Sequence, residues 1–224
     1  MRTLAVGVFA EGPTDLDFYA PLLARVSENV IREAGRHPVR IADVTALPGR
    51  PSQESFVRTI REYAPTCDLI VVHTDGAGDP NRARRERIEP WFRSVDQGAV
   101  QVRIVELIPV RETEAWMLCD LDALNRVLGT ARTRSQFGVP NRTREVEQVQ
   151  APKELLREIQ VSVVGARRAR KLKLRPLYPR LGQEVSLDEL GNVPAFCDFL
   201  RAFKDVLASL AFIPLDPRKI AVEP

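Results

Sequence analysis

The sequence lacks several features that would point to whole classes of protein. No apolar run approaches the roughly 18–20 residues that a membrane-spanning helix needs. The first residues read MRTLAVGVFAEGPT, a short apolar stretch that passes into charged residues without a small-residue cleavage site. We therefore expect neither a signal peptide nor a membrane partner.

Cysteine and histidine are also scarce. The chain has three cysteines (Cys67, Cys119 and Cys197) and two histidines (His37 and His73). An odd number of widely spaced cysteines favours a reducing cytoplasm and argues against a disulfide framework or a zinc cluster. With so little histidine, a bound metal would depend mainly on carboxylates, which favours Mg²⁺, Mn²⁺ or Ca²⁺.

The formal net charge of +3 is too small to indicate a nucleic-acid partner by itself. The charge is unevenly distributed, however, with a net charge of −3 in residues 1–120 and +6 in residues 121–224. This asymmetry suggests an anionic partner for the second half. Lysine is absent from residues 1–152, which disfavours a phospho-acceptor receiver domain, because such a domain needs a lysine after one of its later strands.

Apolar periodicity in the first half predicts strands that alternate with helices. The expected strands are residues 4–10, 39–47, 69–72 and 100–110, and helices are expected after residues 14, 52, 80 and 112. Thr14 and Ser52 are expected to cap the helices that follow them. The alternation predicts an α/β fold with a mostly parallel four-stranded sheet flanked by helices.

The alternating pattern stops near residue 128. We expect a loop over residues 129–152, helices over 152–160 and 194–210, and a basic segment over 166–180. The chain is therefore predicted to have an α/β core in residues 1–128. Residues 129–224 would form a mainly helical, basic C-terminal extension packed on that core.

Acidic residues follow three of the four predicted strands. Glu11 follows the first strand, Asp75 and Asp79 follow the third, and Glu112 and Glu114 follow the fourth. Parallel strands place such residues at one edge of the sheet, where ligands bind. Crowded carboxylates repel one another unless a cation neutralises them, which suggests a divalent metal. The alternative is that these acids are ordinary solvated loop residues.

Three segments resemble a known domain. Glu11-Gly12-Pro13-Thr14-Asp15 resembles the E-G-x-[ST]-[DE] opening of the Toprim domain, and HTDGAGD over 73–79 resembles its D-x-D strand. ETEAWMLCD over 112–120 is similar to an E-x-E-A-[WL]-L-x-x-D signature. That signature belongs to a poorly characterised bacterial family of Toprim-like proteins, often found beside ATPases in antiphage defence loci.

The resemblance implies a Toprim-like fold and a phosphoryl-transfer centre that depends on Mg²⁺ or Mn²⁺. Glu11 would act as general acid/base or metal ligand, Asp75 and Asp79 would hold metal, and Glu114 would complete the site. The strict D-x-D pattern lacks one acid in either alignment. Its first position is His73 if its second is Asp75, and its second position is Ala77 if its first is Asp75. Asp79 could compensate from the loop. One-metal and inactive versions of the site therefore stay open.

His73 could also exchange a proton, because a histidine pKa lies near neutrality. The alternative is a histidine packed at the end of a strand. We expect Glu11, Asp75 and His73 to be the catalytic residues.

Two basic segments could contact the phosphates of a nucleic acid. The first follows the acidic loop (Arg82, Arg84, Arg85 and Arg87) and could instead pair with Glu86 and Glu89 on a solvated helix. The second, residues 166–180, has seven Lys and Arg residues and no acid. Its candidate contacts are Arg167, Arg168, Arg170, Lys171 and Lys173, with Tyr178 as a possible stacking ring. A solubilising loop or a protein-docking patch is the alternative.

The sequence thus predicts a cytoplasmic, divalent-metal-dependent nuclease that cleaves DNA or RNA. The resemblance implies a role in antiphage defence with an ATPase as a partner. A non-catalytic Toprim-like module that binds nucleic acid or a partner protein is the alternative. The oligomeric state is left open.

Overall fold

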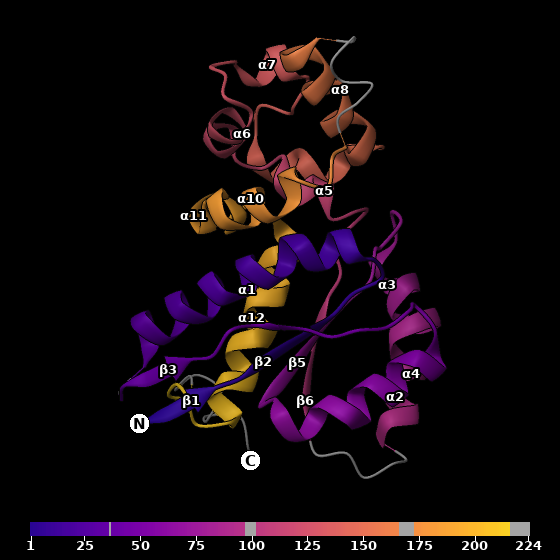
Figure 1. Ribbon diagram of the computed structural model, residues 1–224, viewed down its shortest axis with the longest axis vertical. Coiled ribbons are helices and arrows are strands. Elements are labelled where there is room, and N and C mark those ends of the chain that lie inside the picture. Colours follow the sequence, from indigo (N-terminus) through magenta and orange to yellow (C-terminus); the bar gives the residue numbers. More distant parts are fainter. Residues whose placement is uncertain (36, 97–101, 166–172, 216–224) are drawn as a thin grey trace, which may run out of the picture.

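A computed structural model describes residues 1–35, 37–96, 102–165 and 173–215. It shows a parallel sheet with helices on both faces, and a helical region beyond one end of the sheet (Figure 1). The α/β fold with C-terminal helices that the sequence predicts is confirmed. No helix in the described part of the chain is both long and apolar enough to cross a membrane.

The strands of the fold all pair in parallel. In chain order they are β1 (Arg2–Leu4), β2 (Val6–Phe9), β3 (Val39–Ile41), β4 (Thr45–Ala46), β5 (Leu69–His73) and β6 (Arg103–Leu107). The four-stranded sheet has the order β4-β2-β5-β6, and β1 pairs with β3. Only Ala5 separates β1 from β2, and its backbone N–H donates to the Asp68 carboxylate (2.7 Å).

Two apolar cores form because successive strand residues face opposite sides of the sheet. Val6, Val8 and Val71 belong to the core that includes residues of α1 (Pro13–Ala34) and α12 (Pro194–Ser209). Phe9, Ile70 and Val72 belong to the other core. It includes residues of α2 (Gln53–Tyr63), α3 (Pro80–Ala83), the π-helical turn η2 (Arg84–Ile88) and α4 (Glu89–Asp96). The short apolar strand β5 is therefore buried on both faces, as its sequence predicts.

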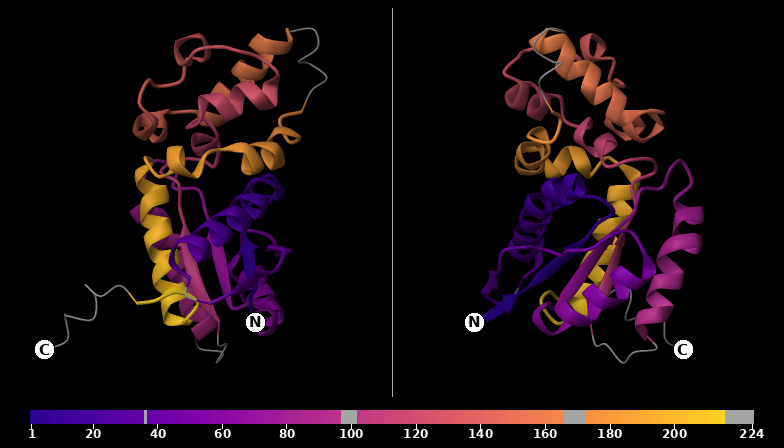
Figure 2. Two further views of the ribbon diagram at one scale, coloured as in Figure 1. Left: turned by 90° about the vertical axis from the view of Figure 1, so that its left-hand side faces the viewer. Right: turned by 45° about the vertical axis from the view of Figure 1, so that its right-hand side comes forward.

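A short 3₁₀ helix, η1 (Ala64–Thr66), precedes β5. The other described helices lie between β6 and α12 in the chain. They are α5 (Glu114–Met117), α6 (Leu121–Leu128), α7 (Arg134–Phe137), η3 (Thr143–Gln148), α8 (Pro152–Val164), α10 (Leu177–Glu184) and α11 (Leu187–Leu190). We call the elements from α5 to α11 the helical cap. The cap lies beyond the carboxyl ends of the strands, and α12 then returns along the sheet (Figures 1 and 2).

Several local predictions differ from the structure. The strand expected over 39–47 is split into β3 and β4, and the loop expected over 129–152 contains α7 and η3. Thr14 was the wrong cap: Gly12 occupies the N-cap of α1, because Pro13 already begins the helix. Ser52 does cap α2 by accepting from the Ser55 backbone N–H. The domain division at residue 128 stays a prediction.

The cap packs on the core through a close approach between α10 and α1. Gly182 allows this contact, because a Cβ at that position would lie 2.3 Å from the Phe18 carbonyl oxygen and 2.8 Å from Pro21 Cγ. Arg25 reinforces the contact by donating to the Gly182 carbonyl oxygen (3.1 Å). Small size at residue 182 therefore sets the distance between the two helices.

Replacing Gly182 with alanine is expected to lower the free energy of unfolding by about 2–3 kcal/mol, because the added methyl overpacks the contact. Urea unfolding followed by circular dichroism measures this loss. Gly129→Ala is the control: Gly129 has a φ of +66° and no atom within 4 Å of an added Cβ, so only about 1 kcal/mol is expected there. Equal losses in the two variants would contradict the packing explanation.

Candidate functional site

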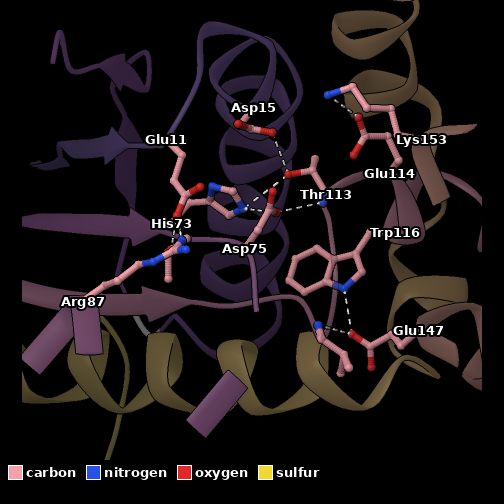
Figure 3. Close-up of polar contacts among 12 residues, drawn as sticks. Glu11, Asp15, His73, Asp75, Arg87, Thr113, Glu114, Trp116, Glu147 and Lys153 are labelled. Carbon is pink, nitrogen blue, oxygen red and sulfur yellow. Dashed lines mark hydrogen bonds and ion pairs between the residues drawn. The ribbon is translucent and has the colours of Figure 1, made fainter. Parts of the chain in front are cut away.

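The candidate site lies at the carboxyl ends of the strands, below the helical cap. Glu11 follows β2 after Ala10, and His73 is the last residue of β5. Asp75 comes two residues later, and the segment after β6 brings Thr113 and Glu114 to the same edge. Figure 3 shows these side chains together, although they do not all point toward one centre.

A tight turn after β5 brings two of these segments together. The backbone N–H groups of Gly76 and Gly78 donate to the carbonyl oxygens of Pro109 (3.0 Å) and Val110 (2.7 Å). A Cβ on Gly76 would lie 2.4 Å from the Pro109 oxygen, so this approach requires glycine. The turn thereby fixes Asp75 beside the segment that carries Thr113.

Glu11 is held by a cation and a hydroxyl. Its Oε1 atom accepts from Arg87 Nη1 (2.5 Å) and from the Thr74 hydroxyl, and Arg87 also donates to Thr74 Oγ1 (3.1 Å). The Arg87 side chain is 46% exposed, whereas that of Glu11 is 23% exposed. Arg87 therefore neutralises Glu11 and still faces solvent, where it could meet an anionic ligand.

His73 is fully buried in a network of polar groups. Its Nε2 atom lies 3.3 Å from Asp75 Oδ1 and 3.2 Å from Thr113 Oγ1. The Thr113 hydroxyl donates to Asp15 Oδ1 (2.8 Å), so its oxygen is left to accept from His73. The Thr113 backbone N–H also donates to Asp75 Oδ1 (3.2 Å). These contacts assign a proton to Nε2 of His73.

The other imidazole nitrogen, Nδ1, is buried without a hydrogen-bond partner among the described residues. Burial lowers the pKa of His73, but the hydrogen bond with Asp75 and the charges of Asp15, Asp75 and Glu11 outweigh it, so the pKa is raised above 6.5. The ring of Tyr19 packs on the imidazole, with 4.7 Å between centroids. A proton that His73 gains or loses is therefore exchanged at Nδ1.

Glu114 is buried and faces the cap. Its Oε1 atom accepts from the hydroxyl of Tyr178 and lies 3.5 Å from Nζ of Lys153. Burial and the interaction with Glu114 raise the pKa of Tyr178, so the phenol stays protonated. Burial lowers the pKa of Lys153, but Glu114 more than offsets it, so the pKa is raised and the amine stays charged. Glu114 therefore joins the sheet edge to α8 and α10.

Glu112 adds another carboxylate to the same region. Its Oε2 atom accepts from the Lys153 backbone N–H (3.3 Å) at the first turn of α8. Burial and repulsion from Glu114 and Asp75 raise the pKa of Glu112. Glu112, Glu114 and Asp75 therefore lie close enough to influence one another's ionisation.

The donors at this edge have the chemistry that Mg²⁺ and Mn²⁺ prefer, because Glu11, Asp15 and Asp75 offer carboxylate oxygens. Among the described residues, however, no three Asp, Glu, His or Cys side chains are close enough together to hold an ion. Mg²⁺ is often held by only one or two carboxylates, with water and substrate phosphates as its other ligands. The residues fit that kind of site, provided that Glu11 is released from Arg87.

The structure separates the predicted site residues. Glu11, His73 and Asp75 lie at one edge, but Glu114 is turned toward Lys153 (Figure 3). Asp79 caps α3 by accepting from the Arg82 backbone N–H (2.9 Å). Glu114 and Asp79 therefore contact other groups. Neither of them is positioned to bind the same ion as Glu11 and Asp75.

The residues predicted to contact phosphate also differ in their surroundings. Arg82 and Arg85 are exposed, whereas Arg84 pairs with Glu106 (2.5 Å) rather than with Glu86 or Glu89. Lys173 is exposed. Arg167, Arg168, Arg170 and Lys171 lie outside the described residues. Tyr178 is buried against Glu114, so the prediction of a stacking ring was wrong.

Sequence reasoning missed Asp15, Thr113 and Lys153 as members of the site. Asp15 ends the segment that resembles the Toprim opening, but the sequence assigned no role to it. Thr113 carries no signal apart from its place between two glutamates. Lys153 lies 39 residues beyond Glu114 in the sequence. Only the position of the cap brings it to the edge of the sheet.

Glu147, another residue that the sequence did not single out, joins the cap to the sheet region. It is buried, and its Oε1 atom accepts from Trp116 Nε1 (3.1 Å) and from the Val110 backbone N–H (3.4 Å). Its Oε2 atom accepts from the Ala195 backbone N–H (3.2 Å). Glu147 thus connects the segments where the chain enters and leaves the cap. Figure 3 shows its contact with Trp116.

Glu147→Gln is expected to lower the free energy of unfolding by about 1–3 kcal/mol, because the glutamine amide offers only one acceptor oxygen to three N–H donors. Urea unfolding measures the loss. Glu145→Gln on the same 3₁₀ helix changes a more exposed residue paired with Arg142 (3.8 Å) and should stay within about 0.5 kcal/mol of the wild type. A Glu147→Gln variant as stable as that control would contradict this connection.

The raised pKa of His73 predicts a pH-dependent stability. The folded state binds this proton more tightly than the unfolded state, so the stabilisation is complete below about pH 6.5 and is lost as pH rises through the folded pKa. Urea unfolding at a series of pH values from about 6.5 upward, with a chelator present, should show the free energy of unfolding of the wild type declining. The decline should persist in His37→Gln and shrink in His73→Gln; an unchanged decline in His73→Gln would refute the assignment.

Comparison with known proteins gives a family but no activity. No curated protein and no solved structure matches the chain. The sequence model of one family, described as a domain of unknown function (DUF4276), matches residues 10–202. Since that match covers most of the 224 residues, the chain belongs to the DUF4276 family.

Proposed function

We propose that the protein cleaves phosphodiester bonds of DNA or RNA with the help of Mg²⁺ or Mn²⁺. The observation that carries the proposal is the meeting of Glu11, His73 and Asp75 at the carboxyl edge of a parallel sheet, where ligands of such folds bind. The resemblance to Toprim domains supports the same chemistry.

Side chains of the edge have distinct roles in this proposal. Arg87 is half-exposed beside Glu11, and its planar guanidinium suits a phosphate group of the substrate. Lys153 is 45% exposed on the side of Glu114 and offers a second positive charge. His73, with its Nε2 proton held by Asp75 and Thr113, would give or take a proton at Nδ1.

Glu11 and Asp75 are the residues that would hold the divalent ion. When bound, the ion would neutralise phosphate oxygens and lower the pKa of an attacking water. A phosphate that draws Arg87 away from Glu11 would free the glutamate for this role. Substrate and ion would therefore be expected to bind with positive cooperativity.

A second candidate function is a non-catalytic module of the same fold. The observation in its favour is that no three potential metal ligands lie close together among the described residues, while Arg87 and Lys153 already neutralise Glu11 and Glu114. In that case the exposed arginines would bind nucleic acid without cleaving it.

Cleavage assays separate the two candidates. The purified chain is incubated with plasmid, single-stranded DNA and RNA, with Mg²⁺, Mn²⁺ or a chelator. We expect metal-dependent cleavage that falls by at least about 100-fold in Glu11→Gln and in Asp75→Asn, because each removes an acid that acts on the reacting groups. Glu86→Gln, an exposed residue of the neighbouring turn, is the matched control and should keep full activity.

Binding without cleavage under every metal condition, unchanged in both edge variants, would favour the module instead. If an ATPase gene lies beside the gene, the assay should be repeated with that ATPase, because the resemblance points to proteins found in such loci. We propose a cytoplasmic site of action, since all three cysteines are free thiols.

A further inference from the structure

The sheet ends on one side at β6, whose described strand neighbour is β5. The Leu107 carbonyl oxygen accepts from the Thr74 N–H (3.3 Å), and in a parallel ladder alternate residues bond to the same neighbour. The backbone N–H and C=O groups of Ile104 and Glu106 therefore point away from β5. Within the described residues these groups have no hydrogen-bond partner.

A groove runs along this open edge. Its main hollow has a volume of about 510 Å³ and is lined by residues of β6, of α12 and of the α3–α4 segment. Most of the lining residues are apolar, among them Phe92, Ile104, Ile108, Phe199, Ala202 and Val206, but polar atoms also line the hollow. A second hollow of about 440 Å³ continues past Val102 and Ser209. We call the two together the β6 groove.

The β6 groove has no excess of positive charge. Its lining holds Arg84 and Arg103 together with Glu106, Asp198 and Asp205. Arg84 pairs with Glu106 (2.5 Å between Nε and Oε2), and Asp198 pairs with Arg201 (2.9 Å). Such a lining does not attract a polyanion. The lining therefore suits an uncharged apolar ligand better than a nucleic acid.

We propose that the β6 groove binds an extended apolar segment of a partner protein, which adds a further strand beside β6. The unpaired backbone groups of Ile104 and Glu106 would bond to the segment, and its alternate side chains would enter the apolar walls. A second copy of the chain fits less well. Its own β6 edge lies between the same flanking helices, so the helices of the two copies would meet before their strands.

The experiment uses the full chain and a phage-displayed library of random peptides. We expect enriched peptides with alternating apolar residues, and we expect each synthetic peptide to slow hydrogen exchange at the Ile104 and Glu106 amides. Ala202→Trp fills the groove from an exposed position and should weaken binding at least about tenfold. Lys204→Trp, on the same helix but in the lining of neither hollow, should bind normally.

If Ala202→Trp fails to fold by circular dichroism, Ala202→Glu tests the same contact with a charge in place of bulk. Three results would overturn the proposal. They are a library that yields no enriched peptide, peptide binding to both Ala202 variants that is as tight as binding to the wild type, and hydrogen exchange at the β6 amides that the peptide does not slow. A dimer seen by light scattering and lost in Ala202→Trp would replace the partner with a second copy. None of these variants touches Glu11, Asp75 or His73, so the outcome is independent of the proposed cleavage.

Discussion

Repulsion among carboxylates at the carboxyl edge of the sheet is the constraint around which the site is organised. Glu11, Asp15, Asp75, Glu112 and Glu114 come from three separate segments, and together they act on the pKa values of His73, Lys153 and Glu112. Such crowding is unfavourable unless positive charge or hydrogen-bond donors offset it. Arg87 does so at one end of the edge and Lys153 at the other, with His73 between them.

The helical cap is part of this arrangement. It contributes Lys153 and the Tyr178 hydroxyl, which together occupy Glu114, while Glu147 fixes the points where the chain enters and leaves the cap. The cap and the sheet are therefore joined both by apolar packing around Gly182 and by buried carboxylates. A change in the groups that contact Glu114 would therefore affect the positions of α8 and α10 as well as the sheet edge.

The parallel sheet could be predicted because β2 and β5 are short apolar runs that end at polar turns, a pattern typical of strands buried on both faces. The acids after these strands could be assigned to one edge for the same reason. Their pairing could not be predicted, because Lys153 and Tyr178 reach Glu114 only through the packing of the cap. The role of Thr113 was equally hidden, since it depends on a turn that holds Gly76 against Pro109.

The central claim is that Glu11 and Asp75 hold a divalent ion once Glu11 is released from Arg87. The most direct measurement is the anomalous difference map of a crystal of the full chain grown with Mn²⁺ and a short, non-hydrolysable oligonucleotide. We expect a peak for a manganese ion within bonding distance of carboxylate oxygens of Glu11 and Asp75, and we expect Arg87 to contact a phosphate group of the oligonucleotide. A map with no peak at this edge, and with Arg87 still paired to Glu11 beside bound oligonucleotide, would contradict it.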